Sequence, residues 1–218
     1  MAFVFLCCIV CARKSLGLAV DVIDASADFV AGTKRVILVP NLHFVFQVIV
    51  FLIWLGSMVC VISLNDIEPS TVIPQGRSIK WKKSVKYMAL FMFFGVLWLL
   101  ALIDYLSRFI IIVSASTYYF NHKRGDTEEN SDAAEVGYGF KCAYFHHFGS
   151  ICIGSFIIAV IRFIKIVFYY LAKKAEKASG DNALISCVVK CALCLLNCIE
   201  KICDYLNESA FCYIAVSG

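Results

Sequence analysis

Two opposite charges stand inside one of the most apolar stretches of the chain. Asp104 and Arg108 lie within residues 85–120, whose sequence is VKYMALFMFFGVLWLLALIDYLSRFIIIVSASTYYF. On a helix, side chains four residues apart share a face, so the carboxylate and the guanidinium can form an ion pair. A charge at the centre of a membrane helix costs about 2.5–3.5 kcal/mol even on the most lenient insertion scale. The pair is therefore either a structural clasp between helices or part of a solute path, and the sequence leaves both open.

Aromatic residues in the same apolar stretches could bind a cationic ligand. Trp54, Tyr87, Trp98 and Tyr105 all lie in runs long enough to enter a membrane. If they faced a shared cavity, their ring faces would attract a quaternary ammonium group, with the Asp104 carboxylate as counter-charge. Taken singly, each ring more often fills a helix interface or the membrane boundary. The candidate substrate-binding residues are therefore Trp54, Trp98, Asp104 and Tyr105.

A stripe of cysteines near the C-terminus is a further candidate for special chemistry. The four residues are spaced by four, three and four positions and so share one face of a helix: Cys187, Cys191, Cys194 and Cys198. Four ligands along one straight helix cannot close a tetrahedron around zinc, so we expect no metal site. A seam of small residues packed on a neighbouring helix is the favoured interpretation. Palmitoylation at a cytosolic interface is the alternative.

Two polar motifs could take part in chemistry, whereas the common catalytic motifs are absent from the sequence. His146 and His147 could relay protons, although at the start of a helix such residues more often lie at the membrane interface. Asn207-Glu208-Ser209 matches the glycosylation sequon, which matters only on the lumenal side. No Ser/His/Asp, HExxH, P-loop or GxGxxG pattern occurs in a plausible setting. The sequence therefore predicts neither an enzyme nor a bound cofactor.

The composition determines the kind of protein in which these residues act. Of the 218 residues, 61% are hydrophobic and 17% charged, and the mean hydropathy is +0.81. A soluble domain averages about 45–50% apolar and about 25% charged residues. The alternating ten-residue segments of a membrane β-barrel are absent. The net charge of +4 is modest and spread over several loops, so no nucleic-acid partner is indicated.

The apolar runs predict an all-α, polytopic helical membrane protein. At residues 13–32, apolar residues recur at three- and four-residue steps with aspartates between them, which indicates a surface amphipathic helix. We expect about 3–5 membrane-embedded helices in all, with spanning helices at 42–64, 85–120 and 142–171, and a spanning or interfacial helix at 184–206. At 1.5 Å per residue, the run 85–120 would reach about 54 Å, so its helix must tilt, break or project beyond the lipid.

The segments between these helices are predicted to be irregular. Prolines and a glycine in residues 65–84 indicate turn and coil, and the hydrophilic stretch after Phe120 indicates a flexible loop. The Lys and Arg residues of the connections divide evenly between the two sides, so the positive-inside rule leaves the orientation open. Residues 1–218 are expected to form a single, partial transmembrane domain, and the chain is expected to be a fragment because its apolar start is too short to span.

Several of these stretches together resemble the choline transporter-like family of solute carriers. The similarity runs through RKSLGLAVDVIDAS after Ala12, GVLW near Gly95 and STYYF ending at Phe120. It continues through HHFGSICIGSF at 146–156, and its most specific part is CVVKCALCLLNCIEKICDYLNESAF at 187–211. Order and spacing agree along nearly the whole chain, and the match is to the C-terminal half of the family.

The resemblance implies about ten spanning helices in a full member, with a large extracellular loop after the first helix. It implies that residues 65–84 are extracellular and residues 121–139 cytosolic. It also implies a departure in the long helix, because relatives commonly carry an acidic residue where this chain has Ala101, and amides where it has Ser107 and Arg108. A fixed cation beside the path would repel choline, so the substrate is expected only at the level of the family.

The predicted function is transport of choline or a related small organic cation across a membrane, with the plasma membrane as the expected location and an organellar membrane as the alternative. The expected partners are that cation and the lipid bilayer. The alternative is a non-transporting membrane scaffold or regulatory protein in which Asp104 and Arg108 form a structural ion pair. A tetraspan receptor-like protein is disfavoured, because its extracellular loop should be long and disulfide-bonded, and residues 65–84 contain no cysteine.

Overall fold

The computed structural model describes residues 13–69, 77–124, 131–179 and 183–217, and the structural statements below concern these residues. The fold is all-α, as predicted from the composition. The elements follow in the order α2 (Arg13–Gly32), the 3-10 helix η1 (Lys34–Ile37), α3 (Leu38–Ile62), β1 (Asp66–Pro69), β2 (Arg77–Lys80), α4 (Lys83–Arg124), α5 (Ser131–Lys141), the π-helix η2 (Cys142–His146), α6 (Phe148–Ser179) and α7 (Ala183–Ser217).

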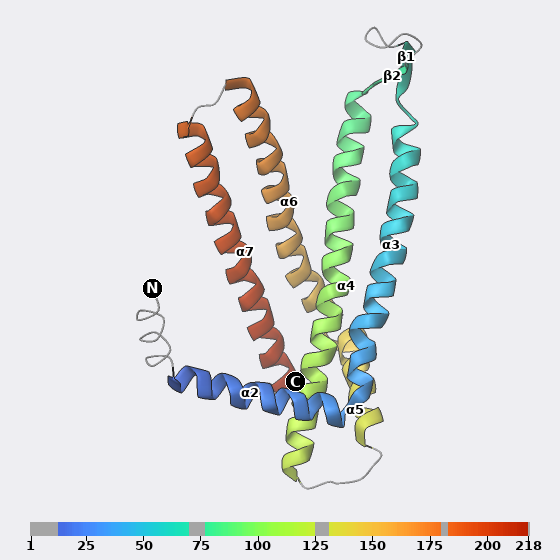
Figure 1. Ribbon diagram of the computed structural model, residues 1–218. Coiled ribbons are helices and arrows are strands. Elements are labelled where there is room, and N and C mark those ends of the chain that lie inside the picture. The colour runs from blue at the N-terminus through green and yellow to red at the C-terminus, as the bar shows by residue number, and fades with distance from the viewer. Residues whose placement is uncertain (1–12, 70–76, 125–130, 180–182, 218) are drawn as a thin grey trace.

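Helices α3 and α4 form an antiparallel pair joined by a β-hairpin (Figure 1). The prediction of turn and coil for residues 65–84 is wrong in part, because β1 and β2 pair in antiparallel register there. Contacts between the two ends of the segment close it. The backbone N–H of Lys82 donates to the Asn65 side-chain oxygen at 3.1 Å, and the Lys82 ammonium lies 2.9 Å from the Asp66 carboxylate.

The helix ends differ from the predicted ranges where local chemistry permits a longer helix. Helix α3 begins at Leu38, before Pro40 rather than after it, because a proline is tolerated within the first helical turn. Helix α4 is one unbroken helix of 42 residues that projects past α2 at the lower end (Figure 1). The loop predicted after Phe120 is also partly helical, since α4 continues to Arg124 and α5 begins at Ser131.

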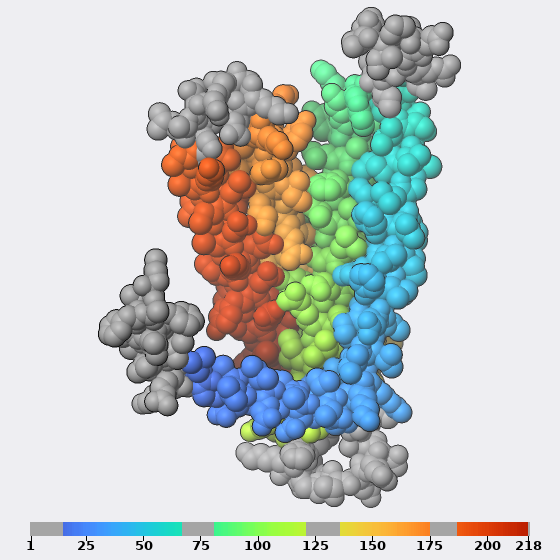
Figure 2. Space-filling view, viewed as in Figure 1, coloured from blue at the N-terminus to red at the C-terminus, as the bar shows by residue number. Residues whose placement is uncertain are grey.

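Helices α6 and α7 form a second antiparallel pair beside α4 (Figure 1). The π-helix η2 leads into α6, which begins at Phe148, six residues later than predicted. Helix α7 runs alongside α6 rather than across the bundle. It ends at Ser217, eleven residues beyond the predicted end. Helix α2, by contrast, lies across the lower part of the bundle (Figure 2).

The core is centred on α4. Its fully buried side chains Phe109 and Ile110 pack with Ile151 and Ile158 of α6 and with Phe211 of α7. Within a bilayer such contacts stabilise the bundle through van der Waals packing, because lipid is as apolar as the side chains themselves. Helix α4 contacts α3, α5, α6 and α7, so it positions every other helix of the two pairs.

Three helical segments among the described residues are long and apolar enough to cross a membrane. They are Lys34–Ile62, Lys83–Phe120 and Phe148–Lys174. Helix α3 leaves large apolar side chains exposed along its length. In water a surface of this kind would be unfavourable, whereas in a bilayer it faces lipid or other helices. The structure therefore fits the predicted polytopic membrane protein.

Candidate functional site

The polar residues of α4 face a row of polar residues on α7. The Tyr105 hydroxyl donates a hydrogen bond to the Asp204 carboxylate. Arg108 lies between two carboxylates, with its guanidinium 3.2 Å from Asp104 and 2.5 Å from Glu208. The structure thus places Asp104 and Arg108 within ion-pair distance and adds two acids that the sequence interpretation overlooked.

The charges of this cluster do not balance. The cluster holds three carboxylates (Asp104, Asp204 and Glu208) and one guanidinium, so with all four groups ionised it carries a net charge of −2. No Lys, Arg or His of the described residues lies within 4 Å of the Asp204 carboxylate, whose bonded partner is the neutral Tyr105 hydroxyl. An unbalanced carboxylate among apolar helices favours binding of a cation.

The two acids of α7 belong to a longer acidic row. Glu200, Asp204 and Glu208 recur at four-residue steps and so share one face of the helix. Glu200 accepts from the Arg162 Nε at 2.9 Å and from the Lys165 Nζ at 2.5 Å, both on α6. The four-residue spacing of these acids, which directly follow the cysteine stripe, is a signal that the sequence already contains.

The aromatic surroundings of Tyr105 are largely occupied by the protein itself. Its ring is buried, with 1% of the residue exposed, and packs edge-to-face on Phe211 with centroids 5.7 Å apart. The Arg108 guanidinium lies 5.7 Å from the centroid of the Tyr105 ring. One cation–π contact of Tyr105 is therefore already made by this chain's own arginine.

The structure places the two candidate tryptophans in different helix seams. Trp54 of α3 donates its indole N–H to the Met92 carbonyl of α4 at 3.1 Å. Trp98 of α4 packs edge-to-face on Phe156 of α6, with centroids 5.4 Å apart. Within the described part of the chain, the buried indole N–H of Trp98 has no hydrogen-bond acceptor. Tyr87, the fourth aromatic considered, is 73% exposed near the start of α4.

A row of phenylalanine rings connects the two tryptophan seams. The centroid distances between successive rings are 6.4 Å from Trp54 to Phe93, 6.3 Å from Phe93 to Phe163, 5.4 Å from Phe163 to Phe94 and 5.7 Å from Phe94 to Phe156. The rings that approach Trp98 therefore belong to the α4–α6 seam, whereas the Tyr105–Asp204 pair belongs to the α4–α7 interface.

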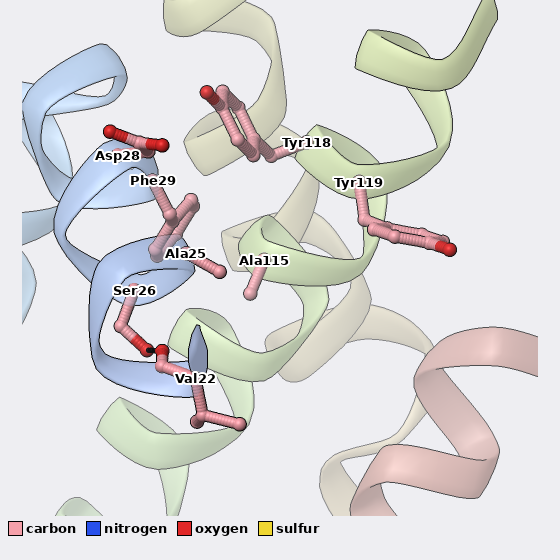
Figure 3. A pocket seen from close by; sticks show the side chains of 8 residues that line it. All are labelled: Val22, Ala25, Ser26, Asp28, Phe29, Ala115, Tyr118 and Tyr119. Carbon is pink, nitrogen blue, oxygen red and sulfur yellow. Dashed lines mark hydrogen bonds between the residues drawn. The ribbon is translucent and has the colours of Figure 1, made fainter. Parts of the chain in front are cut away.

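An open groove of about 790 Å³ lies between α2 and the lower end of α4 (Figure 3). Helix α2 contributes five residues and α4 three: Val22, Ala25, Ser26, Asp28, Phe29, Ala115, Tyr118 and Tyr119. The Phe29 and Tyr118 rings meet edge-to-face at one wall, with centroids 5.4 Å apart. The lining is therefore mostly apolar and aromatic, with one carboxylate.

The remaining sequence motifs have structural explanations. All four cysteines of the stripe are exposed on α7 as free thiols, so no described helix packs on them and the predicted packed seam is wrong for this part of the fold. The Asn207 amide donates to the Gly154 carbonyl of α6 at 3.2 Å, which places the sequon in a helix interface. The His147 ring lies against Phe109, with centroids 5.8 Å apart.

A family model described as "Plasma-membrane choline transporter" matches residues 1–218, the whole chain. The chain belongs to this family. The family description and the three apolar helices together identify a multi-pass membrane protein of the plasma membrane.

Relatives from distant organisms agree with the family assignment. Choline transporter-like protein 3 of Homo sapiens is 24% identical over 208 residues, which are 94% of this chain and 30% of the relative. A CTL-like protein of Dictyostelium discoideum is 25% identical over 222 residues, covering 96% of this chain and 39% of the relative. The chain therefore spans about a third of the length of these relatives.

Proposed function

We propose that this choline transporter-like chain forms part of a carrier for choline or a related small organic cation, and that Asp104, Tyr105 and Asp204 lie on the path of that cation. The observation that supports the proposal best is the acidic excess between α4 and α7. Arg108 engages Asp104 and Glu208, which leaves the Asp204 carboxylate available to a positively charged solute.

The tryptophans fit the same proposal at other points of the path. Trp54 and Trp98 belong to separate seams of the bundle, so they do not form one cage with Tyr105. The unpartnered indole N–H of Trp98 and its half-buried side chain suit a transient contact with a passing solute. In this proposal the cation meets the tryptophans and the acidic cluster in succession.

Choline uptake by the complete protein in cells tests the proposal. Asp204→Asn removes the unbalanced charge but keeps the side-chain shape and an oxygen that can accept from Tyr105. Near a protein surface, unit charges about 4 Å apart attract by about 4 kcal/mol, part of which is offset by desolvation, so we expect uptake to fall about 10- to 100-fold at unchanged surface expression. Asp21→Asn, on the exposed face of α2, is the matched control. Uptake by Asp204→Asn at the level of the unchanged protein would refute a role for this carboxylate in transport.

The second candidate function is a non-transporting scaffold in which the charges only hold helices together. It is favoured by the position of Arg108, which bridges α4 to α7 and also covers the Tyr105 ring. Asp104→Asn and Arg108→Gln, made separately and together, discriminate the two functions. Uptake lost in every variant with normal folding supports a path role. Folding lost in the single variants and restored in the double variant supports the clasp.

A further inference from the structure

The groove between α2 and α4 is not explained by a path through the bundle. It lies towards the lower end of the molecule, where α2 crosses the bundle (Figure 1), whereas the acidic cluster lies higher on α4. From Asp104 to Tyr118 the rise along α4 is about 21 Å at 1.5 Å per residue. The groove is therefore a separate site, and its volume of about 790 Å³ falls within the range of about 300–1,000 Å³ typical of ligand pockets.

The lining of the groove favours a particular kind of cation. Asp28 is its only charged residue, and three aromatic rings (Phe29, Tyr118 and Tyr119) form much of the wall. A primary ammonium is held by hydrogen bonds to several acceptors, whereas most of this lining is apolar or aromatic. A quaternary ammonium donates no hydrogen bond and is stabilised by ring faces and one carboxylate. The groove thus suits a quaternary ammonium better than a primary one.

The aromatic wall and the carboxylate stand on one face of α2. Asp28 and Gly32 are four residues apart and lie on the same side of the helix. A Cβ atom at Gly32 would lie 3.2 Å from the Tyr118 ring, so the ring already rests against this side of α2. The glycine allows this close approach and keeps Tyr118 beside Phe29, as the edge-to-face contact shows.

The surroundings of the groove indicate that the cation is part of a lipid. Helix α2 carries large apolar side chains, among them Val20, Ile23 and Val30, that are exposed to the surroundings of the bundle. In a membrane protein, an amphipathic helix that lies across the ends of the spanning helices occupies the region between headgroups and acyl chains. In that region an apolar groove is filled by lipid. No lysine or arginine lines it, so an anionic lipid would bring its charge to Asp28 without a partner.

We propose that the groove binds a choline phospholipid, with the trimethylammonium group against Asp28 and the tyrosine rings and the upper acyl chain along Val22, Ala25 and Ala115. The phosphate, which sits next to the trimethylammonium group, is solvated at the open side of the groove. This lipid would hold α2 at a fixed height against α4, because it contacts both helices at once. The site is independent of transport by the bundle.

Photocrosslinking in reconstituted vesicles tests the proposal without any transport measurement. Phosphatidylcholine and phosphatidylserine carrying the same photoactivatable acyl chain are compared, and labelled peptides are mapped to residues 22–29 and 115–119. We expect the choline lipid to label both segments more strongly than the serine lipid. Asp28→Asn should lower labelling by the choline lipid about two- to fivefold, the range expected for a contact at an exposed site. Asp24→Asn, on the same helix but outside the lining, should leave it unchanged.

Three results would overturn the proposal. Equal labelling by both lipids would mean that the groove holds ordinary annular lipid. Unchanged labelling in Asp28→Asn would remove the carboxylate from the site. Loss of lipid labelling on addition of free choline would identify the free cation as the occupant. A second variant, Asp28→Lys, gives a positive check, because it should reverse the preference towards phosphatidylserine.

Discussion

Substitution of one glycine in α5 should reveal how tightly this short helix docks on the core. Gly139 is buried against α4, and a Cβ atom there would lie 2.9 Å from the Ile110 carbonyl oxygen and 3.1 Å from the Ser114 hydroxyl oxygen. The first of these neighbours is backbone and cannot rotate away. The Ser114 hydroxyl is itself bonded to the same carbonyl at 2.8 Å. Gly139→Ala therefore forces α5 away from α4, and overpacking of this kind costs about 1–3 kcal/mol.

Gly137→Ala is the matched control, since a Cβ atom at Gly137 meets nothing within 4 Å. Both substitutions bring the same gain in helix propensity, about 0.5–1 kcal/mol, so the difference between them isolates the steric clash. At about 2–4 °C per kcal/mol for a chain of this size, Gly139→Ala should unfold about 2–12 °C below Gly137→Ala. Thermal unfolding of the purified protein, followed by size-exclusion chromatography, measures this difference. Equal transition temperatures would show that α5 does not dock on α4 as described.

Two further substitutions test the contacts between the helices. Glu200→Gln leaves Arg162 and Lys165 of α6 without their carboxylate. Removing one partner of a fully buried ion pair costs about 3–5 kcal/mol of stability. Because both of these cations are about one-third exposed, we expect a smaller loss of about 1–3 kcal/mol. The neighbouring exposed Lys201→Gln should change nothing measurable, and equal stabilities in a thermal unfolding assay would contradict the α6–α7 ion pairs. Trp54→Phe removes the hydrogen bond from the indole to the Met92 carbonyl and should lower stability by about 0.5–1.5 kcal/mol. The control Tyr87→Phe, at an exposed position, should not change stability. If Trp54→Phe unfolds at the same temperature as the unchanged protein, α3 does not rely on this bond.

The fold class and the family could be predicted because they depend on properties local to the sequence. Composition alone indicates a helical membrane protein, and the family match over residues 1–218 confirms the resemblance drawn from the short motifs. The ends of the helices were harder to predict from the sequence than the fold class. The start of α3 at Leu38 depends on the tolerance of Pro40 in a first turn, and the β-hairpin depends on contacts between residues as far apart as Asn65 and Lys82.

The candidate site was harder to predict because its partners are distant in the sequence. The spacing of Asp104 and Arg108 indicates their ion pair, but Tyr105 and Asp204 are 99 residues apart. Packing decides which face of α7 lies against α4. The rotation of a helix about its own axis cannot be predicted from the sequence pattern alone. For the same reason the sequence did not predict that Trp54 and Trp98 lie in different seams. Their positions along the helices were predictable, but the helices that their side chains contact were not. The roles of these residues stay predictions until uptake is measured.

The ion pairs between α6 and α7 have a consequence for biosynthesis. Helix α7 carries Lys190, Glu200, Lys201, Asp204 and Glu208, and it is not among the three segments apolar enough to span alone. Each charge adds about 2.5–3.5 kcal/mol to insertion at a helix centre. Glu200 meets Arg162 and Lys165 only when α6 and α7 already lie side by side. The two helices are therefore best released from the translocon as a preformed hairpin, with Glu200 already paired with Arg162 and Lys165 before it meets lipid.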